Sequence, residues 1–207
     1  MRLLVFGATG ATGRQLVSQA LEQDHEVTAF VRRPEALVPR QGLRVVRGDT
    51  RDRASVEAAV AGHDAALSAL GIGMSLMPGT LIADSMRNIV PALERAGVRR
   101  FVLMSAFGVG ATRNDAPPLL RLMYGTLLAG IFADKRDGED IVRASALEWT
   151  IVYPVVLTGG PLTARYRASE RLELSGLPTI ARADVAHFML AEAAERRYVR
   201  KGVVIAT

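Results

Sequence analysis

Apolar runs and helical patterns alternate along all 207 residues of the chain. Short stretches rich in Val, Ile, Leu and Phe are typical of buried strands, and apolar residues three and four positions apart are typical of helices. The pattern predicts strands near 2–6, 26–31, 43–47, 65–69, 100–105, 150–154 and 202–206. It predicts helices near 11–23, 53–61, 80–96, 134–146 and 183–195. This alternation favours a doubly wound α/β domain with helices on both faces of a mainly parallel sheet.

Residues at the ends of the predicted helices support these assignments. Asp52 and Thr80 stand where N-caps are expected, and Gly62 and Gly97 stand just past two C-termini. Pro91 lies inside the 80–96 pattern, where it should kink the helix or mark a break.

Three glycines, Gly7, Gly10 and Gly13, follow the first strand and open the first helix. A tight strand-to-helix turn without side chains lets a phosphate reach the backbone N–H groups of the helix N-terminus. The spacing G-x-x-G-x-x-G departs from the usual G-x-G-x-x-G, and an ordinary turn is the other interpretation. The flanking strand and helix favour dinucleotide binding and a Rossmann-type sheet.

The ends of the next strands carry further candidate cofactor contacts. Arg32 and Arg33 end the second strand, where an acidic residue would bind the ribose hydroxyl of NAD. Guanidinium groups there favour the 2′-phosphate of NADP(H), although two simply exposed arginines would give the same pattern. Asp49 and Thr50 follow the third strand and either approach adenine or form a turn or helix cap. Gly71, after the fourth strand, would let the backbone pass close to the cofactor, or it is an ordinary loop residue.

Composition excludes several classes of function. The chain has no cysteine, so it has no disulfides, thiolate metal sites or cysteine nucleophiles. The net charge is +5, but the basic residues are scattered in pairs such as Arg99-Arg100, which favours a solvated surface over nucleic-acid binding. No apolar stretch reaches about 18 residues, so we expect a soluble, cytoplasmic protein of one domain, 1–207, without membrane contact.

The segment Leu119–Phe132 is strongly apolar and too short to span a bilayer. A buried helix is the favoured interpretation. A wall or lid of the substrate pocket comes next, followed by a dimer or membrane-surface contact.

The three histidines lack metal-ligand spacing, and no metal site is expected. The carboxylates between Asp134 and Asp140 are interpreted as a solvated helix face rather than an acid/base pair. Trp149 is interpreted as a core residue.

An ordered set of motifs gives a family resemblance. LLVFGATGATG, EVTAFVRRPEAL, IVRASALEWTIVYP and ARADVAHFML occur in this order and span most of the chain. They resemble the atypical short-chain dehydrogenases/reductases of the NAD(P)-binding, NmrA-like type, and within these the NADPH-dependent flavin and biliverdin reductases. The resemblance implies NADP(H) as cofactor and a flavin, tetrapyrrole or similar conjugated molecule as hydride acceptor.

The resemblance also implies roles for individual residues. Ser105 would lie near the site of hydride transfer, where its hydroxyl orients the nicotinamide or bonds the substrate; alternatively, it satisfies local backbone. Lys135 would contact the nicotinamide ribose or a substrate anion; an exposed helix ion pair is the other interpretation. The expected cofactor-binding residues are Gly7, Thr9, Gly10, Ala11, Thr12, Gly13, Arg32, Arg33, Asp49, Thr50, Leu70, Gly71 and Pro154.

The chain lacks the Tyr-x-x-x-Lys pair with which common short-chain dehydrogenases exchange a proton with an alcohol or ketone. Reduction of an electron-poor flavin needs little acid catalysis and stays compatible with this absence. A non-catalytic NADP(H)-binding sensor of the NmrA-like type is the alternative, and a nucleotide-sugar or quinone enzyme is a third. The nucleotide-sugar function is disfavoured because the extra C-terminal substrate domain of sugar-modifying relatives is not found. A monomer or weak homodimer is expected.

Overall fold

The structure is a computed structural model that describes residues 1–71, 79–115 and 129–207. Its strands are β1 (Arg2–Phe6), β2 (Glu26–Val31), β3 (Leu43–Arg47), β4 (Ala65–Ser68), β5 (Arg100–Met104), β6 (Glu148–Pro154), β7 (Val156–Thr158), β8 (Arg167–Ser169), β9 (Thr179–Ala181) and β10 (Lys201–Ala206). Its α-helices are α1 (Ala11–Glu22), α2 (Arg53–Val60), α3 (Leu81–Arg95), α5 (Ala129–Ala144) and α6 (Arg182–Glu195). Two short 3-10 helices are η1 (Pro34–Ala36) and η2 (Gly110–Asp115).

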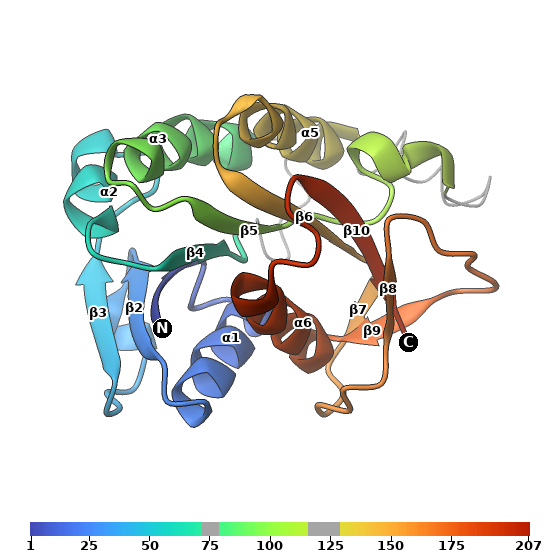
Figure 1. The fold of residues 1–207 in the computed structure, drawn as a ribbon, viewed down its shortest axis with the longest axis horizontal. Coiled ribbons are helices and arrows are strands. Elements are labelled where there is room, and N and C mark those ends of the chain that lie inside the picture. Colours follow the sequence, from blue (N-terminus) through green and yellow to red (C-terminus); the bar gives the residue numbers. More distant parts are fainter. Residues whose placement is uncertain (72–78, 116–128) are drawn as a thin grey trace.

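The main sheet has eight strands in the order β3-β2-β1-β4-β5-β6-β10-β8 (Figure 1). All neighbouring pairs are parallel except β10 and β8. The strand order reverses between β1 and β4, which is the topological switch point of a Rossmann-type sheet. The expected doubly wound α/β fold is therefore confirmed.

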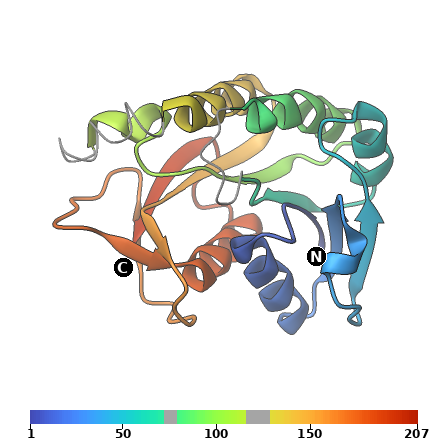
Figure 2. The same cartoon turned by 180° about the vertical axis from the view of Figure 1, so that it is seen from behind.

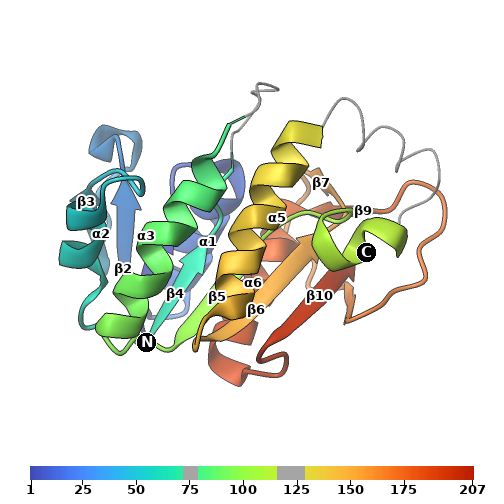
Figure 3. The same ribbon diagram turned by 90° about the horizontal axis from the view of Figure 1, so that it is seen from above.

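Helices cover both faces of this sheet. Helices α2, α3 and α5 lie on one face, and α1 and α6 lie on the other (Figures 1 and 2). Seen from above, α3 and α5 run side by side across the sheet (Figure 3). The central strands are buried on both faces, as the continuous apolar runs of β1, β4 and β5 require.

All seven predicted strands are present, but three short ones, β7, β8 and β9, were not predicted. Strand β8 pairs antiparallel with the edge of the sheet at β10, and β7 pairs with β9 in a separate two-stranded sheet. Each has three residues. Three residues are too few to show a recognisable pattern of alternation.

Details at the helix ends differ from the sequence prediction in two places. Thr80 is the N-cap of α3, but its hydroxyl bonds the Asp84 carboxylate rather than a backbone N–H. The helix also continues through Pro91, so the predicted break is absent there and a kink stays the other interpretation. Asp52 caps α2 by accepting bonds from the backbone N–H groups of Ala54 and Ser55, as predicted.

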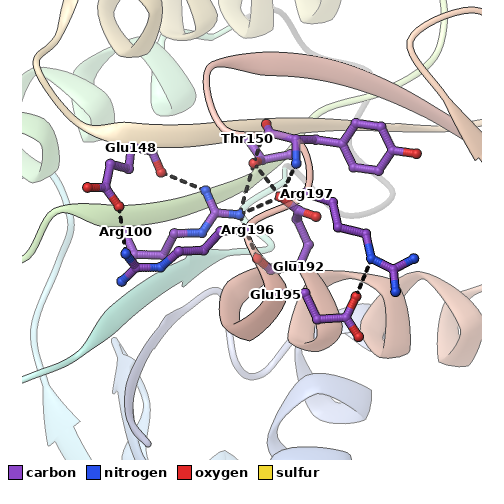
Figure 4. A network of polar contacts seen from close by, with 8 residues as sticks. Arg100, Glu148, Thr150, Glu192, Glu195, Arg196 and Arg197 are labelled. Atoms are coloured by element: carbon purple, nitrogen blue, oxygen red, sulfur yellow. Dashed lines mark hydrogen bonds and ion pairs between the residues drawn. The ribbon is translucent and has the colours of Figure 1, made fainter.

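Arg100 is fully buried, so the expectation that it lies on a solvated surface is wrong. Figure 4 shows its polar contacts. Its guanidinium donates to the carboxylate and the backbone carbonyl of Glu192 and to the hydroxyl of Thr150. Glu192 also accepts the backbone N–H of Tyr198 at 2.8 Å. Strands β5 and β6, helix α6 and the turn before β10 are thereby joined, because a buried charge is tolerated only when it is paired and hydrogen-bonded.

The apolar segment Leu119–Phe132 falls outside the described residues, except for its last four, which belong to α5. Within the described ranges no helix combines the length and the apolar character needed to cross a bilayer.

Candidate functional site

A cleft lies at the carboxyl ends of β1, β2, β3 and β4, at the switch point of the sheet. In open α/β sheets, ligands bind at this place because the two halves of the sheet diverge there. The residues that line the cleft follow these four strands, and one belongs to α3: Gly7, Thr9, Gly10, Phe30, Val31, Arg32, Gly48, Thr50, Ala69, Leu70, Gly71 and Leu81.

The glycine loop is so tightly packed that side chains would not fit. Gly7 has φ +77°, and a Cβ there would lie 2.7 Å from the backbone carbonyl of Ala69. A Cβ on Gly13 would lie 2.1 Å from the carbonyl oxygen of Gly7. The loop therefore needs glycine at both positions, one for the backbone conformation and one for the close helix-to-strand approach.

The N-terminus of α1 faces this loop with free donors. Gly10 is the N-cap, and within the described residues no side chain caps the first turn. The N–H groups of Ala11, Thr12 and Gly13 are therefore available, and the helix dipole adds partial positive charge. Arg14 steadies the loop through a bond from Nε to the Thr9 carbonyl at 3.1 Å. This is the geometry of an anion-binding site.

Arg32 and Arg33 differ in placement. Arg32 is exposed and lines the cleft, and its charge contributes to the lowered pKa of Asp49. Arg33 is exposed at the start of η1 and lies outside the set of described residues that line the cleft. The structure thus brings one of the two arginines to the cleft, while its contact with a 2′-phosphate stays a prediction.

Asp49 is engaged in a turn. Its carboxylate accepts bonds from the Arg51 guanidinium and the Arg51 backbone N–H, which lower its pKa to about 2. Thr50 lines the cleft, and its hydroxyl lies 2.7 Å from that of Ser85. The turn interpretation of Asp49 therefore agrees with its contacts, while an adenine contact stays a prediction.

Five residues that line the cleft were not predicted from the sequence: Phe30, Val31, Gly48, Ala69 and Leu81. Gly48 approaches the ring of Phe30 so closely that a Cβ would lie 2.2 Å from the ring atom Cζ. Phe30 in turn packs edge-on against Phe6. Gly48 could have been found from the sequence. It follows a strand directly and precedes Asp49-Thr50, and a glycine at such a place indicates that another group approaches the backbone closely.

A second polar site lies where β5 and β6 end. Ser105 follows β5 and is 4% exposed, and its hydroxyl donates to Glu139 Oε1 at 2.5 Å. Tyr153, near the end of β6, donates to Glu139 Oε2 at 2.7 Å and accepts from Arg143 at 2.7 Å. Ser105 therefore does more than satisfy local backbone, because its hydroxyl is bonded to a buried carboxyl group.

Pairing in the sheet relates Ser105 to the cleft. Ser68 of β4 pairs with Leu103 of β5, and Leu70 and Ser105 each follow two residues later. Both therefore come at the carboxyl edge of adjacent parallel strands. Pro154 ends β6, the next strand along, and its carbonyl accepts the backbone N–H of Phe107.

The prediction that residues 134–140 form a solvated helix face is wrong in part. Asp134 and Glu139 are buried, whereas Asp137 and Asp140 are exposed. Glu139 faces the ends of β5 and β6, and Asp134 accepts the backbone N–H groups of Ile82 and Ala83 at the start of α3. Burial follows from these partners on other elements, which helical spacing alone does not show.

Lys135 does not form the exposed ion pair considered from the sequence. The side chain is half-buried, and in the described part of the chain its ammonium has no ion-pair or hydrogen-bond partner. Burial lowers the pKa of its ammonium, while the charges of Glu139 and Asp134 act in the opposite direction.

Burial also dominates the electrostatics of the Ser105 site. It raises the pKa of Glu139 above the ordinary range, although bonds from Ser105 and Tyr153 and the charges of Arg143 and Lys135 oppose this. The pKa of the Tyr153 phenol is raised by burial and by the neighbouring Glu139. A carboxyl group poised to hold a proton beside a serine hydroxyl is typical of functional sites.

The cleft fits a nicotinamide dinucleotide. Side chains at Gly7 and Gly13 would not fit the glycine loop, the N-terminus of α1 offers free N–H donors, and Arg32 adds positive charge to the cleft lining. No group of three or more metal-ligating side chains occurs among residues 1–71, 79–115 and 129–207.

Comparison with known sequences agrees with this geometry. The chain is 29% identical over 203 residues to an uncharacterized sugar epimerase, YhfK, of Bacillus subtilis, covering 95% of this chain and 89% of that protein. It is 37% identical over 172 residues to sterol demethylase protein B of Methylococcus capsulatus, covering 77% of this chain and 52% of that protein. The chain thus spans nearly all of one relative and about half of the other.

Solved structures share the fold over nearly the whole chain. One is a short-chain dehydrogenase/reductase of Veillonella parvula in complex with NADP, with TM-score 0.84 and 19% identity, covering 100% of this chain and 94% of that one. Another is ChuY, an anaerobillin reductase of Escherichia coli O157:H7, with TM-score 0.82 and 25% identity, covering 99% and 96%. The model of the NAD(P)H-binding family matches residues 7–196. The chain therefore belongs to the NAD(P)H-binding family, which confirms the expectation of a nicotinamide dinucleotide as cofactor.

Proposed function

We propose that this protein is an NADPH-dependent reductase that passes a hydride to a flat conjugated acceptor such as a flavin or a tetrapyrrole. The bound cofactor would supply the hydride. The observation that carries the proposal is the meeting of two sites at one sheet edge: a dinucleotide cleft at β1–β4 and the Ser105–Glu139 pair at the end of β5.

All predicted residues except Arg33 and Asp49 have a role in this proposal. The backbone from Gly7 to Gly13 would bind the pyrophosphate, Arg32 the 2′-phosphate, and Thr50 the adenosine. Leu70, Gly71 and Pro154 would lie along the ribose and nicotinamide. Ser105 would bond the nicotinamide amide or the acceptor, and Lys135 would provide positive charge next to the substrate.

The names of similar proteins support a reductase. ChuY is described as an anaerobillin reductase. A Streptomyces griseus protein named (4-alkanoyl-5-oxo-2,5-dihydrofuran-3-yl)methyl phosphate reductase is 32% identical over 153 residues, which cover 73% of this chain and 46% of that protein. Both names describe reductases, the class of enzyme proposed for this chain.

A non-catalytic NADP(H) sensor is the second candidate. The missing Tyr-x-x-x-Lys pair favours it, because the proton donor of common short-chain dehydrogenases is absent from the sequence.

Steady-state oxidation of NADPH separates the two candidates. FMN, riboflavin, biliverdin and menadione serve as acceptors, and the affinity for NADPH is measured by calorimetry. We expect turnover with at least one acceptor, lowered about 10- to 100-fold in Ser105→Ala, with a smaller change in NADPH affinity. Tight NADPH binding without oxidation by any acceptor would instead identify a sensor.

A further inference from the structure

Four polar side chains form a chain of contacts from the end of β5 to the surface of α5. Ser105 bonds Glu139, Glu139 bonds Tyr153, and Tyr153 bonds Arg143. The first three are buried, whereas the Arg143 side chain is 32% exposed. A buried carboxyl group beside Ser105 is thus linked to solvent by hydrogen bonds.

Two glycines leave the space that this cluster occupies. A Cβ on Gly110 would lie 2.4 Å from Glu139 Oε2, and a Cβ on Gly202 would lie 2.7 Å from the Tyr153 ring atom Cε2. The backbone of η2 and of β10 therefore approaches the cluster as closely as it can, and the positions of Glu139 and Tyr153 are tightly restrained.

The hydrogen bond between Ser105 and Glu139 can run in either direction, whereas the other two bonds of the cluster have a fixed direction. A guanidinium can only donate, so the Tyr153 oxygen accepts from Arg143 and its single hydrogen goes to Glu139 Oε2. The direction of the bond between Glu139 Oε1 and Ser105 depends on whether Glu139 carries a proton. When Glu139 is ionised, the serine donates to it and can only accept from a bound molecule. When Glu139 is protonated, it donates to the serine, whose own hydrogen is then free for a bound molecule.

The surroundings of Glu139 favour such a change of protonation. Among the described residues, Ser105 and Tyr153 hydrogen-bond to Glu139, and the charges of Arg143 and Lys135 act on it. From α3, the nearest atoms to a Cβ placed on the adjacent Gly138 are the Ile82 side chain and backbone and the Met86 side chain. Burial raises the pKa of Glu139 above its ordinary value and so favours the protonated form.

We propose that Glu139 is a positioning residue that stores the proton which Ser105 delivers to the reduced acceptor, an inference that rests on the proposed reductase activity. The acceptor first gains a hydride, that is, two electrons and one hydrogen nucleus. The Ser105 O–H bond then breaks, its proton goes to the acceptor, and the carboxyl proton of Glu139 moves to the serine oxygen. The cofactor is oxidised, the acceptor is reduced by two electrons, and Glu139 is left as a carboxylate that takes a proton from water.

The pH dependence of single-turnover NADPH oxidation tests this role, with the acceptor that gives the fastest turnover. We expect the wild-type rate to fall about tenfold per pH unit above the pKa of Glu139, because only the protonated form delivers a proton. In Glu139→Gln the amide donates to Ser105 but has no proton to give. The rate should therefore be lower than in the wild type by at least about tenfold, and it should be independent of pH over the same range.

Asp140→Asn is the matched control, since it makes the same chemical change at the exposed neighbouring position of α5. Its pH profile should equal that of the wild type, and NADPH affinity should be the same in all variants. An unchanged alkaline fall of the rate in Glu139→Gln would overturn the proposal.

Tyr153→Phe gives an independent test if Glu139→Gln does not fold. The Tyr153 hydroxyl donates to the Glu139 carboxylate and so lowers its pKa. Its removal should raise the pKa and shift the fall of the rate to higher pH. An unshifted midpoint contradicts the proposal.

A readout without turnover distinguishes failure of this inference from failure of the proposed function. The carboxyl carbon of Glu139 is followed by 13C NMR in the NADPH complex and assigned by its loss in Glu139→Gln. We expect a titration midpoint above the ordinary glutamate value of about 4.3, shifted further upward in Tyr153→Phe. A midpoint at or below that value would overturn the role of Glu139 whether or not an acceptor is reduced.

Discussion

Single residues of the glycine loop are determined by backbone contacts. Gly13 lies where a Cβ would overlap the Gly7 carbonyl oxygen, while no atom of the described residues lies within 4 Å of a Cβ placed on Gly71. The two glycines therefore play different parts, although both line or adjoin the cleft.

Gly13→Ala should destabilise the protein and weaken cofactor binding, because the loop must move to admit the methyl group. We expect a loss of about 1–3 kcal/mol in the free energy of unfolding, measured by urea denaturation. Gly71→Ala is the control and should leave stability nearly unchanged. Equal stability of the two variants would show that the loop tolerates a side chain.

Arg32 is the residue expected to select the phosphorylated cofactor. Arg32→Ala should weaken NADPH binding about 10- to 100-fold, since a hydrogen bond to a charged group contributes roughly 1.5–3 kcal/mol. NADH has no 2′-phosphate, and its affinity should change less than about twofold. Calorimetric titration with both nucleotides measures this.

Arg44→Ala removes the same charge from β3, at an exposed position outside the cleft lining, and serves as the control. Equal losses for NADPH and NADH in Arg32→Ala would show that Arg32 does not bind the 2′-phosphate.

At the scale of elements, α5 provides the side-chain cap that the N-terminus of α3 lacks. The N-cap Thr80 makes no side-chain bond to the first turn of α3, and Asp134 of α5 accepts the N–H groups of Ile82 and Ala83 at 2.9 Å each. One buried carboxylate thus caps a neighbouring helix and sets the position of α5 beside α3.

Asp134→Ala should lower the free energy of unfolding by about 2–3 kcal/mol, because two N–H groups lose a charged acceptor in a buried place. Asp137→Ala, on the exposed side of the same helix, should cost less than about 0.5 kcal/mol. Chemical denaturation compares the two. A similar small effect of both would mean that water replaces the carboxylate at the start of α3.

At the scale of the whole molecule, the Arg100–Glu192 pair joins the sheet to α6 (Figure 4). Both side chains are essentially unexposed, at 0% and 1%. Burial lowers the pKa of Arg100, and the charge of Glu192 opposes this, so each partner depends on the other.

Arg100→Met alone should destabilise the protein by about 3–5 kcal/mol, because a buried carboxylate would lose its counter-charge. Combination with Glu192→Leu should recover part of the loss, since neither charge then remains buried. Urea denaturation of both variants measures this. A double variant no more stable than Arg100→Met would show that the bonds of Glu192 to Thr150 and Tyr198 matter more than the ion pair.

Much of the fold could be predicted from the sequence, because it depends on local patterns. The apolar strands, the helical periodicity and the glycine turn after β1 are each encoded within about 15 consecutive residues. Arg32, Thr50 and Leu70 reach one cleft because they follow parallel strands, whose carboxyl ends meet at one edge.

The tertiary structure decided which polar side chains are buried. Glu139 meets Ser105 from 34 residues away, and Asp134 meets Ile82 from 52 residues away. A charged residue on a helix is exposed unless another element covers it and provides partners, and helical spacing does not show which element that is. The sequence by itself therefore determined the sheet and the dinucleotide cleft, whereas only the packing of α5 against β5, β6 and α3 placed a buried carboxyl group beside Ser105.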